Sequence, residues 1–514
     1  MGVLSFKGIF VFVMPTKPNN NKTNKPSLLS SAGLLIALNL VVKPIWIFGI
    51  DRTVQLTAGQ QVYGQYFKLF TYALLPATLL DVGINNYLSR YLAQNPQHFQ
   101  QTFAPVVLLR LLLAAFYMII CFVMLFAQNN INPTYISLLS WFAIGQIFLG
   151  FLQFIRANLQ GLHIFTPDSI ISVIDRLLMI AGGGILLWMA SKNQQPFNMV
   201  WYASLQTLCY GISFIVAITI LHRYTKPWAW SNFRWRQNWS SIGFMLRNTW
   251  PFALLGLLMT VFTRGDVALL SILLPTEKAN AEVDVYALAW RMLDALNIIG
   301  VLMATVLMPG FSRMLARNQP VNNIVGIAGR WLLVFAACAS VAAWLGQLVW
   351  MRENTYAAQV FAILMLAFIA MVLVHIYGSL ASATGKIGAL NWLASGCFLF
   401  NFLLNTWLIP QYYALAAACI ALLTQLFMLI GCLWLAKKYA KLIWSAKRLA
   451  QSLVFLAGCS TAYILTNKLL PTIHLFGQIG LACLSCFGWA LLIGFISFAD
   501  LKFALKWKAE SPEA

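Results

Sequence analysis

The sequence predicts an all-α integral membrane protein of about fourteen transmembrane helices, with two six-helix lobes related by pseudo-two-fold symmetry plus a C-terminal helix pair. Three observations lead to this fold class: the composition, the spacing of apolar runs and a faint internal repeat. Hydrophobic residues make up 61% of the 514 residues and charged residues only 9%, whereas soluble domains carry about 25% charged residues. So little charge cannot cover a soluble surface.

Apolar runs of about 20 residues, the length that crosses a bilayer, recur along the chain. The loops between them are short, so we expect no sizeable domain outside the membrane. The runs predict spans at 28–50, 66–92, 104–128, 132–158, 168–190, 198–221, 248–274, 285–309, 325–350, 357–380, 388–409, 412–436, 449–466 and 475–499.

The internal repeat relates the two halves of the chain by a nearly constant offset. The offset 286 − 63 = 223 holds for three pairs, which are Tyr63 with Tyr286, Lys68 with Arg291 and Arg90 with Arg313. Further along, Gly161 closes "ANLQG" as Gly385 closes "ASATG". Two homologous halves in a membrane protein are typical of a transporter whose substrate site lies between them. We therefore expect a cavity lined by spans one, two, seven and eight, sealed on one side only.

The distribution of the net charge of +21 predicts the orientation. Lys and Arg gather in alternate loops, and cytoplasmic loops are the ones enriched in these residues. Both termini are then cytoplasmic. The mixture of Trp with Arg and Lys in 222–247 fits a membrane surface better than nucleic acid. The predicted domains are a tail (1–27), an N-lobe (28–221), a linker (222–247), a C-lobe (248–436) and a terminal pair with its basic loop and tail (437–514).

The residue pattern resembles a known family. The motif "YGQY" from Tyr63 leads into the second span, which carries a D-x-G from Asp81 and a closing Arg90. The second lobe opens with "WPFALLGLLMTVFTRGDVALL", and "NTWLIPQYYALAAACIALLTQ" follows near its end. This order is similar to that of Wzx-like polysaccharide flippases of the multidrug/oligosaccharidyl-lipid/polysaccharide (MOP) exporter superfamily. The segment "PQYYALAAA" carries Tyr and Ala where the resemblance leads us to expect glycines.

The resemblance implies a transporter that moves an undecaprenyl-(pyro)phosphate-linked oligosaccharide to the outer leaflet by alternating access, for O-antigen, capsule or exopolysaccharide synthesis. It implies a monomer in the bacterial inner membrane, with membrane lipids around it and a polysaccharide polymerase and glycosyltransferases as functional partners. It implies no cofactor. The nine cysteines fall inside apolar spans and predict buried free thiols, with no metal site.

Cations inside the spans are the candidate substrate-binding residues. A charge at mid-membrane costs about 2.5–3.5 kcal/mol on insertion scales, so such residues tend to face a cavity and mark function. An anionic phosphate carrier needs a wet, cationic cavity. Snorkelling to the headgroups is the alternative for each cation. The candidates are Lys43, Lys68, Arg110, Arg176, Arg264 and Arg291.

Four aspartates and one histidine are candidates for ion coupling or for charge pairing. Asp294 follows Arg291 by three residues, so the two can pair on one helix face. A protonatable Asp can couple transport to protons, and neutralising a neighbouring Arg is the alternative role. For the histidine we expect an interhelical hydrogen bond before a proton relay. These residues are Asp81, Asp175, Asp266, Asp294 and His375.

Two other functions are compatible with a multi-span protein. A cation-coupled small-molecule exporter of the multidrug type usually needs an acidic cluster in an apolar cavity, but the cations inside the spans are at least as numerous as the acids. A membrane enzyme, such as a polysaccharide polymerase or an acyltransferase, needs a large external loop or a buried His with a catalytic partner. The sequence offers neither feature, and catalysis does not account for the repeat. We therefore expect a transporter and no enzyme.

Overall fold

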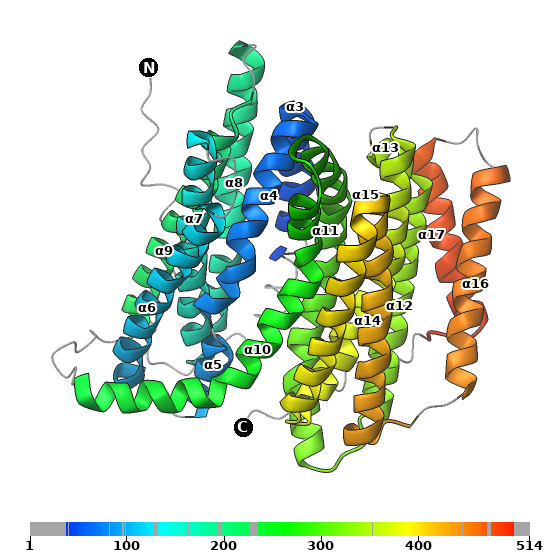
Figure 1. Ribbon diagram of the computed structural model, residues 1–514. Coiled ribbons are helices and arrows are strands. Elements are labelled where there is room, and N and C mark those ends of the chain that lie inside the picture. The colour runs from blue at the N-terminus through cyan, green and yellow to red at the C-terminus, as the bar shows by residue number, and fades with distance from the viewer. Residues whose placement is uncertain are drawn as a thin grey trace, which may run out of the picture.

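The computed structural model describes residues 38–497, except 40, 82, 95, 96, 98, 127–131, 163, 194–196, 226–234, 352, 444, 445 and 470–473. Every regular element within these residues is a helix (Figure 1). The predicted N-terminal tail (1–27) lies outside the described residues, as do residues 498–514 of the predicted C-terminal domain.

The first lobe opens with a broken span. Residues 41–44 are helical, and after Pro44 the chain continues as a π-helix, η1 (Ile45–Asp51), and then α3 (Arg52–Ala58). Pro44 is thus followed by irregular helix, in agreement with the perturbation expected from proline. The rest of the lobe is α4 (Gln60–Ala77), η2 (Thr78–Leu80), α5 (Ile84–Gln94), α6 (Phe99–Phe126), α7 (Pro133–Gly161), α8 (Phe165–Asn193) and α9 (Met199–Tyr224).

The second lobe repeats this order, and its first two long helices are longer than those of the first lobe. The C-terminal pair follows it directly. The elements are α10 (Trp235–Leu273), α11 (Thr276–Ala316), α12 (Asn322–Leu345), α13 (Gln347–Trp350), α14 (Thr355–Ala383), α15 (Ile387–Ala440), α16 (Ala446–Leu469) and α17 (Leu475–Leu492). The predicted linker 222–247 overlaps the end of α9 and the start of α10, so two of the predicted domain boundaries fall inside helices.

The number of spans agrees with the prediction. Within the described residues, eleven helices are long and apolar enough to cross a membrane. One of them, α15, is two helices joined at Tyr413, whose φ of 55° and ψ of −135° are not helical. The first span is interrupted at η1 and the second at η2, and the two are joined at Gly59. These two spans complete the predicted fourteen.

The kink at Tyr413 lies where the resemblance predicts glycines. A positive φ is unusual for a residue with a side chain and costs of order 1–3 kcal/mol. Neighbouring groups support the conformation. The ammonium of Lys278 lies 3.3 Å from the centre of the Tyr413 ring, and the carboxylate of Glu282 accepts a hydrogen bond from the backbone N–H of Ala414 at 3.1 Å. The turn therefore keeps a glycine-like backbone without glycine.

The helices form two lobes that meet along α4, which packs against α10 and α11. Figure 1 shows α6 to α9 on one side of this contact, α12, α14 and α15 on the other, and α16 and α17 at the outer edge beyond α12. The repeat pairs occupy equivalent helices. Tyr63 lies in α4 and Tyr286 in α11, the second span of each lobe, while Gly161 and Gly385 close the fourth.

We name the two ends of the bundle by their charge. The basic end carries Arg223 at the end of α9 and Lys437 and Lys438 near the end of α15. The far end carries the α3–α4 turn at Gly59 and the α10–α11 turn at Pro275. In Figure 1 the first part of α10 runs along the basic end beneath the first lobe before the helix turns up into the bundle.

Candidate functional site

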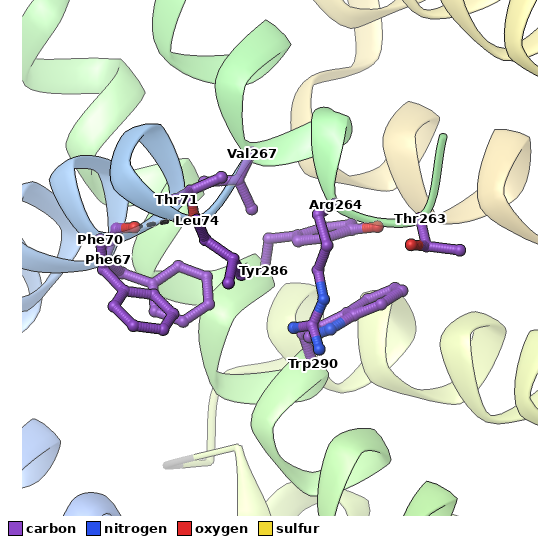
Figure 2. Close-up of a pocket in the computed structure, with 9 residues that line it drawn as sticks. All are labelled: Phe67, Phe70, Thr71, Leu74, Thr263, Arg264, Val267, Tyr286 and Trp290. Carbon is purple, nitrogen blue, oxygen red and sulfur yellow. Dashed lines mark hydrogen bonds between the residues drawn. The ribbon is translucent and has the colours of Figure 1, made fainter. Parts of the chain in front are cut away.

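Two small pockets lie between the lobes. One is lined by residues of α4, α10 and α11, which include Arg264, Tyr286 and Trp290 (Figure 2). The other lies between the first span and α11, and its lining includes Asp51 and Arg291. Spans one, two, seven and eight line these pockets, as the sequence predicts. Each pocket has an internal volume of about 10 Å³, which is room for about one water, so this conformation is closed.

The lobes touch at both ends of the bundle. At the far end the amide of Gln55 donates to the Asp284 carboxylate at 2.9 Å. Helix α4 crosses α11 so closely there that a Cβ on Gly64 would lie 2.0 Å from the Asn280 carbonyl oxygen. Towards the basic end, a Cβ on Gly83 would lie 3.1 Å from that of Phe252. The expected one-sided seal is therefore absent, because small residues on the second span let the lobes close at two depths.

The first lobe contains a buried carboxylate that an arginine neutralises from the other lobe. Asp51 is 1% exposed and accepts hydrogen bonds from the hydroxyls of Tyr63 at 3.2 Å and Tyr202 at 3.1 Å. The Arg291 guanidinium of α11 reaches across the interface to within 3.1 Å of it. Two tyrosines and one cation thus compensate the cost of burying this carboxylate.

The second lobe contains a buried carboxylate with neutral partners. Asp266 on α10 is 0% exposed. Its oxygens accept from the Tyr286 hydroxyl at 2.6 Å and from the amides of Asn401 at 3.2 Å and Asn405 at 2.9 Å. Among the described residues, no Lys or Arg forms an ion pair with Asp266. The amide oxygen of Asn405 is buried and has no hydrogen-bond partner.

Arg264 lies at the first pocket in a two-pronged ion pair. Both of its terminal nitrogens donate to the Asp294 carboxylate at 2.8 Å. Its guanidinium carbon lies 5.3 Å from the centre of the Trp290 ring, and Figure 2 shows the two side chains next to each other. Asp294 therefore pairs with Arg264 on the neighbouring helix, whereas Arg291, its predicted partner, pairs with Asp51.

Arg176 and Lys43 lie in the first lobe near the same interface. The Arg176 guanidinium stacks 4.2 Å over the Trp46 ring and donates to the Tyr210 hydroxyl at 3.3 Å. Its charge partner is the adjacent Asp175, at 3.6 Å. Lys43 is partly buried in the first span. Because Arg291 lies 5.9 Å from the same indole, Trp46 separates two of the predicted cations.

The remaining predicted site residues lie away from the pockets. Arg110 is 2% exposed and binds Asp81 at 2.8 Å and the Gly150 carbonyl at 2.9 Å inside the first lobe. This network braces the second span where η2 interrupts it. Lys68 is 8% exposed and lies 5.9 Å from the Tyr72 ring.

The histidine bridges two helices of the second lobe. A ring nitrogen of His375 lies 2.9 Å from the Asn297 side-chain oxygen, which is the interhelical hydrogen bond expected from the sequence. Within the described ranges, no cluster of three or more His, Cys, Asp or Glu side chains could hold a metal ion.

Four polar residues of this interface are absent from the predicted set: Asp51, Tyr202, Asn401 and Asn405. The sequence prediction misses Asp51 because the first apolar run ends at residue 50, whereas η1 continues the helical span through Asp51. The asparagines carry no charge, so a search for charged residues inside the spans passes over them. Their i, i+4 spacing in an apolar helix, which places both amides on one face, was the available signal.

Two repeated lobes of helices that are long and apolar enough to cross a membrane, with polar residues between them, define a multi-pass membrane protein. The family model described as polysaccharide biosynthesis protein matches residues 34–315, so the chain belongs to that family. No curated protein matches the chain by sequence at a significant level.

Solved structures share the fold at low identity. The lipid II flippase MurJ in an inward-closed conformation has a TM-score of 0.63 and 13% identity, covering 91% of this chain and 99% of that one. A MOP superfamily transporter from Pyrococcus furiosus gives 0.61 and 13%, covering 82% and 99%. A mutant of the MATE transporter VcmN from Vibrio cholerae gives 0.55 and 14%, covering 81% and 98%.

Proposed function

We propose that the protein flips an oligosaccharide linked to undecaprenyl phosphate or diphosphate from the cytoplasmic to the outer leaflet of the bacterial inner membrane. The product feeds surface polysaccharide synthesis. Family membership and the two-lobed fold support this proposal. The single observation that carries it is the placement of Arg264 and Arg291 at the inter-lobe pockets, each held by one carboxylate.

The Arg264–Asp294 pair suits an anion exchange. A guanidinium fork binds a carboxylate and a phosphate with the same two parallel N–H donors. In the closed state the fork of Arg264 is filled by Asp294. As the lobes open, a diphosphate can take the place of the carboxylate on Arg264, so that the guanidinium keeps a counter-charge, and water can solvate the released Asp294, which is 22% exposed even in the closed state. We assign substrate binding to Lys43, Arg176, Arg264 and Arg291, and assign Arg110 with Asp81 to bracing the lobe. Lys68 stays a prediction.

Glycan export in cells that depend on this protein tests the anion site. We expect Arg264→Gln and Lys43→Gln to abolish export while the protein reaches the membrane at a normal level, because the phosphate loses its counter-charge. Arg264→Lys should keep part of the activity. Lys192→Gln, an exposed lysine at the end of α8, is the matched control and should export normally. If each of the single variants Arg264→Gln, Lys43→Gln and Arg291→Gln exports glycan normally, the anion site is refuted.

We propose Asp266 as the site of the coupling cation. Its carboxylate is buried without an ion-pair partner among the described residues, and the unpartnered Asn405 oxygen offers a further ligand atom. Either a proton or Na⁺ relieves a carboxylate in such a place. Transport into vesicles under imposed proton and sodium gradients distinguishes the two ions. Transport by Asp266→Asn that still responds to a gradient as the wild type does would exclude this role.

The second candidate is a cation-coupled small-molecule exporter of the same superfamily. The neutral donor cage around Asp266 is the observation that favours it, since it fits ion coupling whatever the cargo. The two functions separate in one experiment. A strain that lacks the protein should accumulate lipid-linked glycan on the cytoplasmic side and keep its normal sensitivity to toxic cations. The opposite phenotype would favour the exporter.

A further inference from the structure

A tryptophan at the first inter-lobe pocket carries a buried hydrogen-bond donor that is not used. Trp290 lines the pocket beside Arg264 and is 4% exposed. Its indole N–H has no hydrogen-bond partner. More than 90% of buried polar groups in folded proteins are paired, so an unpaired donor calls for an explanation.

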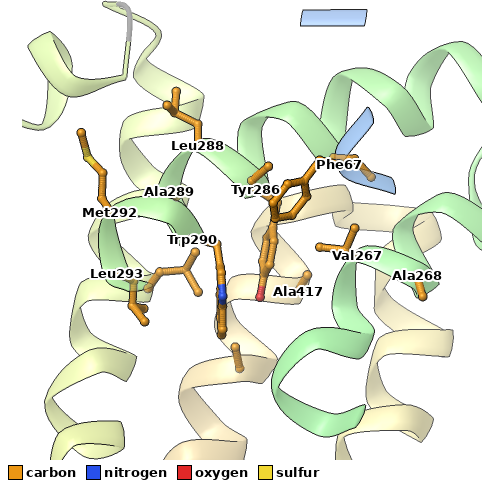
Figure 3. Packing of buried hydrophobic residues seen from close by; sticks show 14 of the residues in the cluster. Phe67, Val267, Ala268, Tyr286, Leu288, Ala289, Trp290, Met292, Leu293 and Ala417 are labelled. Atoms are coloured by element: carbon orange, nitrogen blue, oxygen red, sulfur yellow. The ribbon is translucent and has the colours of Figure 1, made fainter. Parts of the chain in front are cut away.

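The polar groups of the neighbouring side chains are engaged with partners other than this N–H. Both oxygens of Asp294 accept from Arg264. The Tyr286 ring stacks on Trp290, with ring centres 5.8 Å apart, and its hydroxyl donates to Asp266 (Figure 3). Leu293 and Ala417, which belong to the same buried cluster as Trp290, have no acceptor in their side chains. In the closed state the Trp290 N–H is therefore free at the edge of a pocket that the Arg264 guanidinium also lines.

The repeat shows that this donor belongs to one lobe only. At the offset of 223 residues, the counterpart of Trp290 in the first lobe is Phe67, since 290 − 223 = 67. Phe67 lines the same pocket from α4. An aromatic ring is thus used at both positions, but only the second lobe adds an N–H. Packing alone does not require the nitrogen.

We propose that the indole N–H of Trp290 donates a hydrogen bond to a phosphate oxygen of the carrier lipid, next to Arg264. The inference rests on the proposed function, because it needs an anionic headgroup between the lobes. A guanidinium above the ring face and an N–H at the ring edge present two donors from different directions to one phosphate. When the pocket widens, Trp290 and Arg264 together distinguish a phosphate-bearing lipid from an uncharged one.

Binding of two probes to the full-length protein in lipid nanodiscs tests this assignment. The probes are undecaprenyl diphosphate and undecaprenol, which share the tail and differ in the phosphates. We expect Trp290→Phe to weaken binding of the diphosphate about tenfold, the effect of one charge-assisted hydrogen bond, and to leave undecaprenol binding unchanged. Trp331→Phe is the matched control, because the Trp331 N–H is also buried and unpartnered but packs against Phe487 near α17.

A spectroscopic measurement keeps the test valid if Trp290→Phe folds poorly. In protein labelled with ¹⁵N at the indole nitrogens, the Trp290 N–H resonance should shift on addition of undecaprenyl diphosphate, while that of Trp331 should not. Equal affinity of Trp290→Phe and wild type for the diphosphate, or an unmoved Trp290 resonance at saturation, would overturn the inference. If the wild type binds neither probe, the proposed function itself fails.

Discussion

In each lobe the repeated tyrosine donates to a buried aspartate, but the two aspartates have different electrostatic settings. Tyr63 donates to Asp51 in the first lobe, and Tyr286, its repeat counterpart, donates to Asp266 in the second. Asp51 has Arg291 as a partner from across the interface, whereas Asp266 has only neutral amides beside its tyrosine. The tyrosines match at the offset of 223 residues but the aspartates do not, because 51 + 223 = 274 is Leu274, so each lobe supplies its carboxylate from a different position of the repeat. The neutralised carboxylate joins the lobes, and we assign the other to an exchangeable cation.

Two cations that are equivalent in the repeat have different partners. Arg291 and Lys68 are equivalent, yet only Arg291 forms an ion pair with the carboxylate of the opposite lobe. Lys68 instead lies against the Tyr72 ring in its own lobe, 5.9 Å from the ring centre. A guanidinium offers several donors in a rigid plane, which suits a buried pair better than an ammonium. Of these two equivalent cations, Arg291 neutralises a carboxylate of the opposite lobe, while Asp266 has no ion pair among the described residues.

The largest expected effect comes from removing the cross-lobe cation. Arg291→Gln leaves Asp51 buried without a counter-charge, which should lower the free energy of unfolding by about 3–5 kcal/mol. The double variant Asp51→Asn with Arg291→Gln should recover most of this loss, because no isolated charge remains. Denaturant unfolding in detergent micelles measures both. A single variant as stable as the wild type would show that the pair contributes nothing to joining the lobes.

The next effect concerns how closely the lobes approach. Gly64 follows Tyr63 directly, and its repeat counterpart Ala287 already carries a Cβ. Gly64→Ala would place a Cβ 2.0 Å from the Asn280 oxygen. We expect this overpacking to cost about 1–3 kcal/mol in the closed state and to open the far end.

Thiol labelling of a cysteine placed at Gln61 reports that opening. Gln61 is exposed at the far end and contacts the Glu277 carbonyl at 3.2 Å. Labelling should be faster in the Gly64→Ala background than in the parent. The control is Gly388→Ala, because a Cβ there meets nothing within 4 Å. Equal labelling rates in all three backgrounds would contradict a far-end gate at Gly64.

A third prediction concerns the carboxylate of the second lobe. Asp266→Asn keeps the shape and removes the charge, so stability should change by less than about 1 kcal/mol, within the range of isosteric replacements of a hydrogen-bonded group. The dependence of export on the ion gradient should disappear. Asp51→Asn should do the reverse: it strands the charge of Arg291 and destabilises the protein. Similar stability losses in the two variants would remove the distinction between the lobes.

The sequence predicted the architecture well because a bilayer dictates span length and apolarity. The repeat likewise placed Tyr63 and Tyr286 on equivalent helices. Which residues form ion pairs with each other was harder to predict from the sequence. The i, i+3 rule pairs Asp294 with Arg291 on one helix, yet the ion pair joins Asp294 to Arg264 thirty residues away. Which side chains meet across a helix interface depends on helix rotation and crossing. The apolar pattern constrains these weakly in helices that are hydrophobic on most faces.

A last prediction separates the two tyrosines. Tyr286→Phe removes a 2.6 Å bond from a carboxylate with neutral partners, and Tyr63→Phe removes a 3.2 Å bond from one that keeps Arg291 and Tyr202. We expect the free energy of unfolding to fall by about 1.5–3 kcal/mol for Tyr286→Phe and by about 0.5–1.5 kcal/mol for Tyr63→Phe, the ranges for charged and ordinary hydrogen bonds.

Unfolding measurements on both variants, and on each combined with Asp266→Asn, test this. In the Asp266→Asn background the cost of Tyr286→Phe should shrink, because the hydroxyl then faces an amide, while the cost of Tyr63→Phe should stay the same. Equal costs for the two tyrosines in the wild-type background would mean that Arg291 does not relieve Asp51 of its dependence on neutral donors.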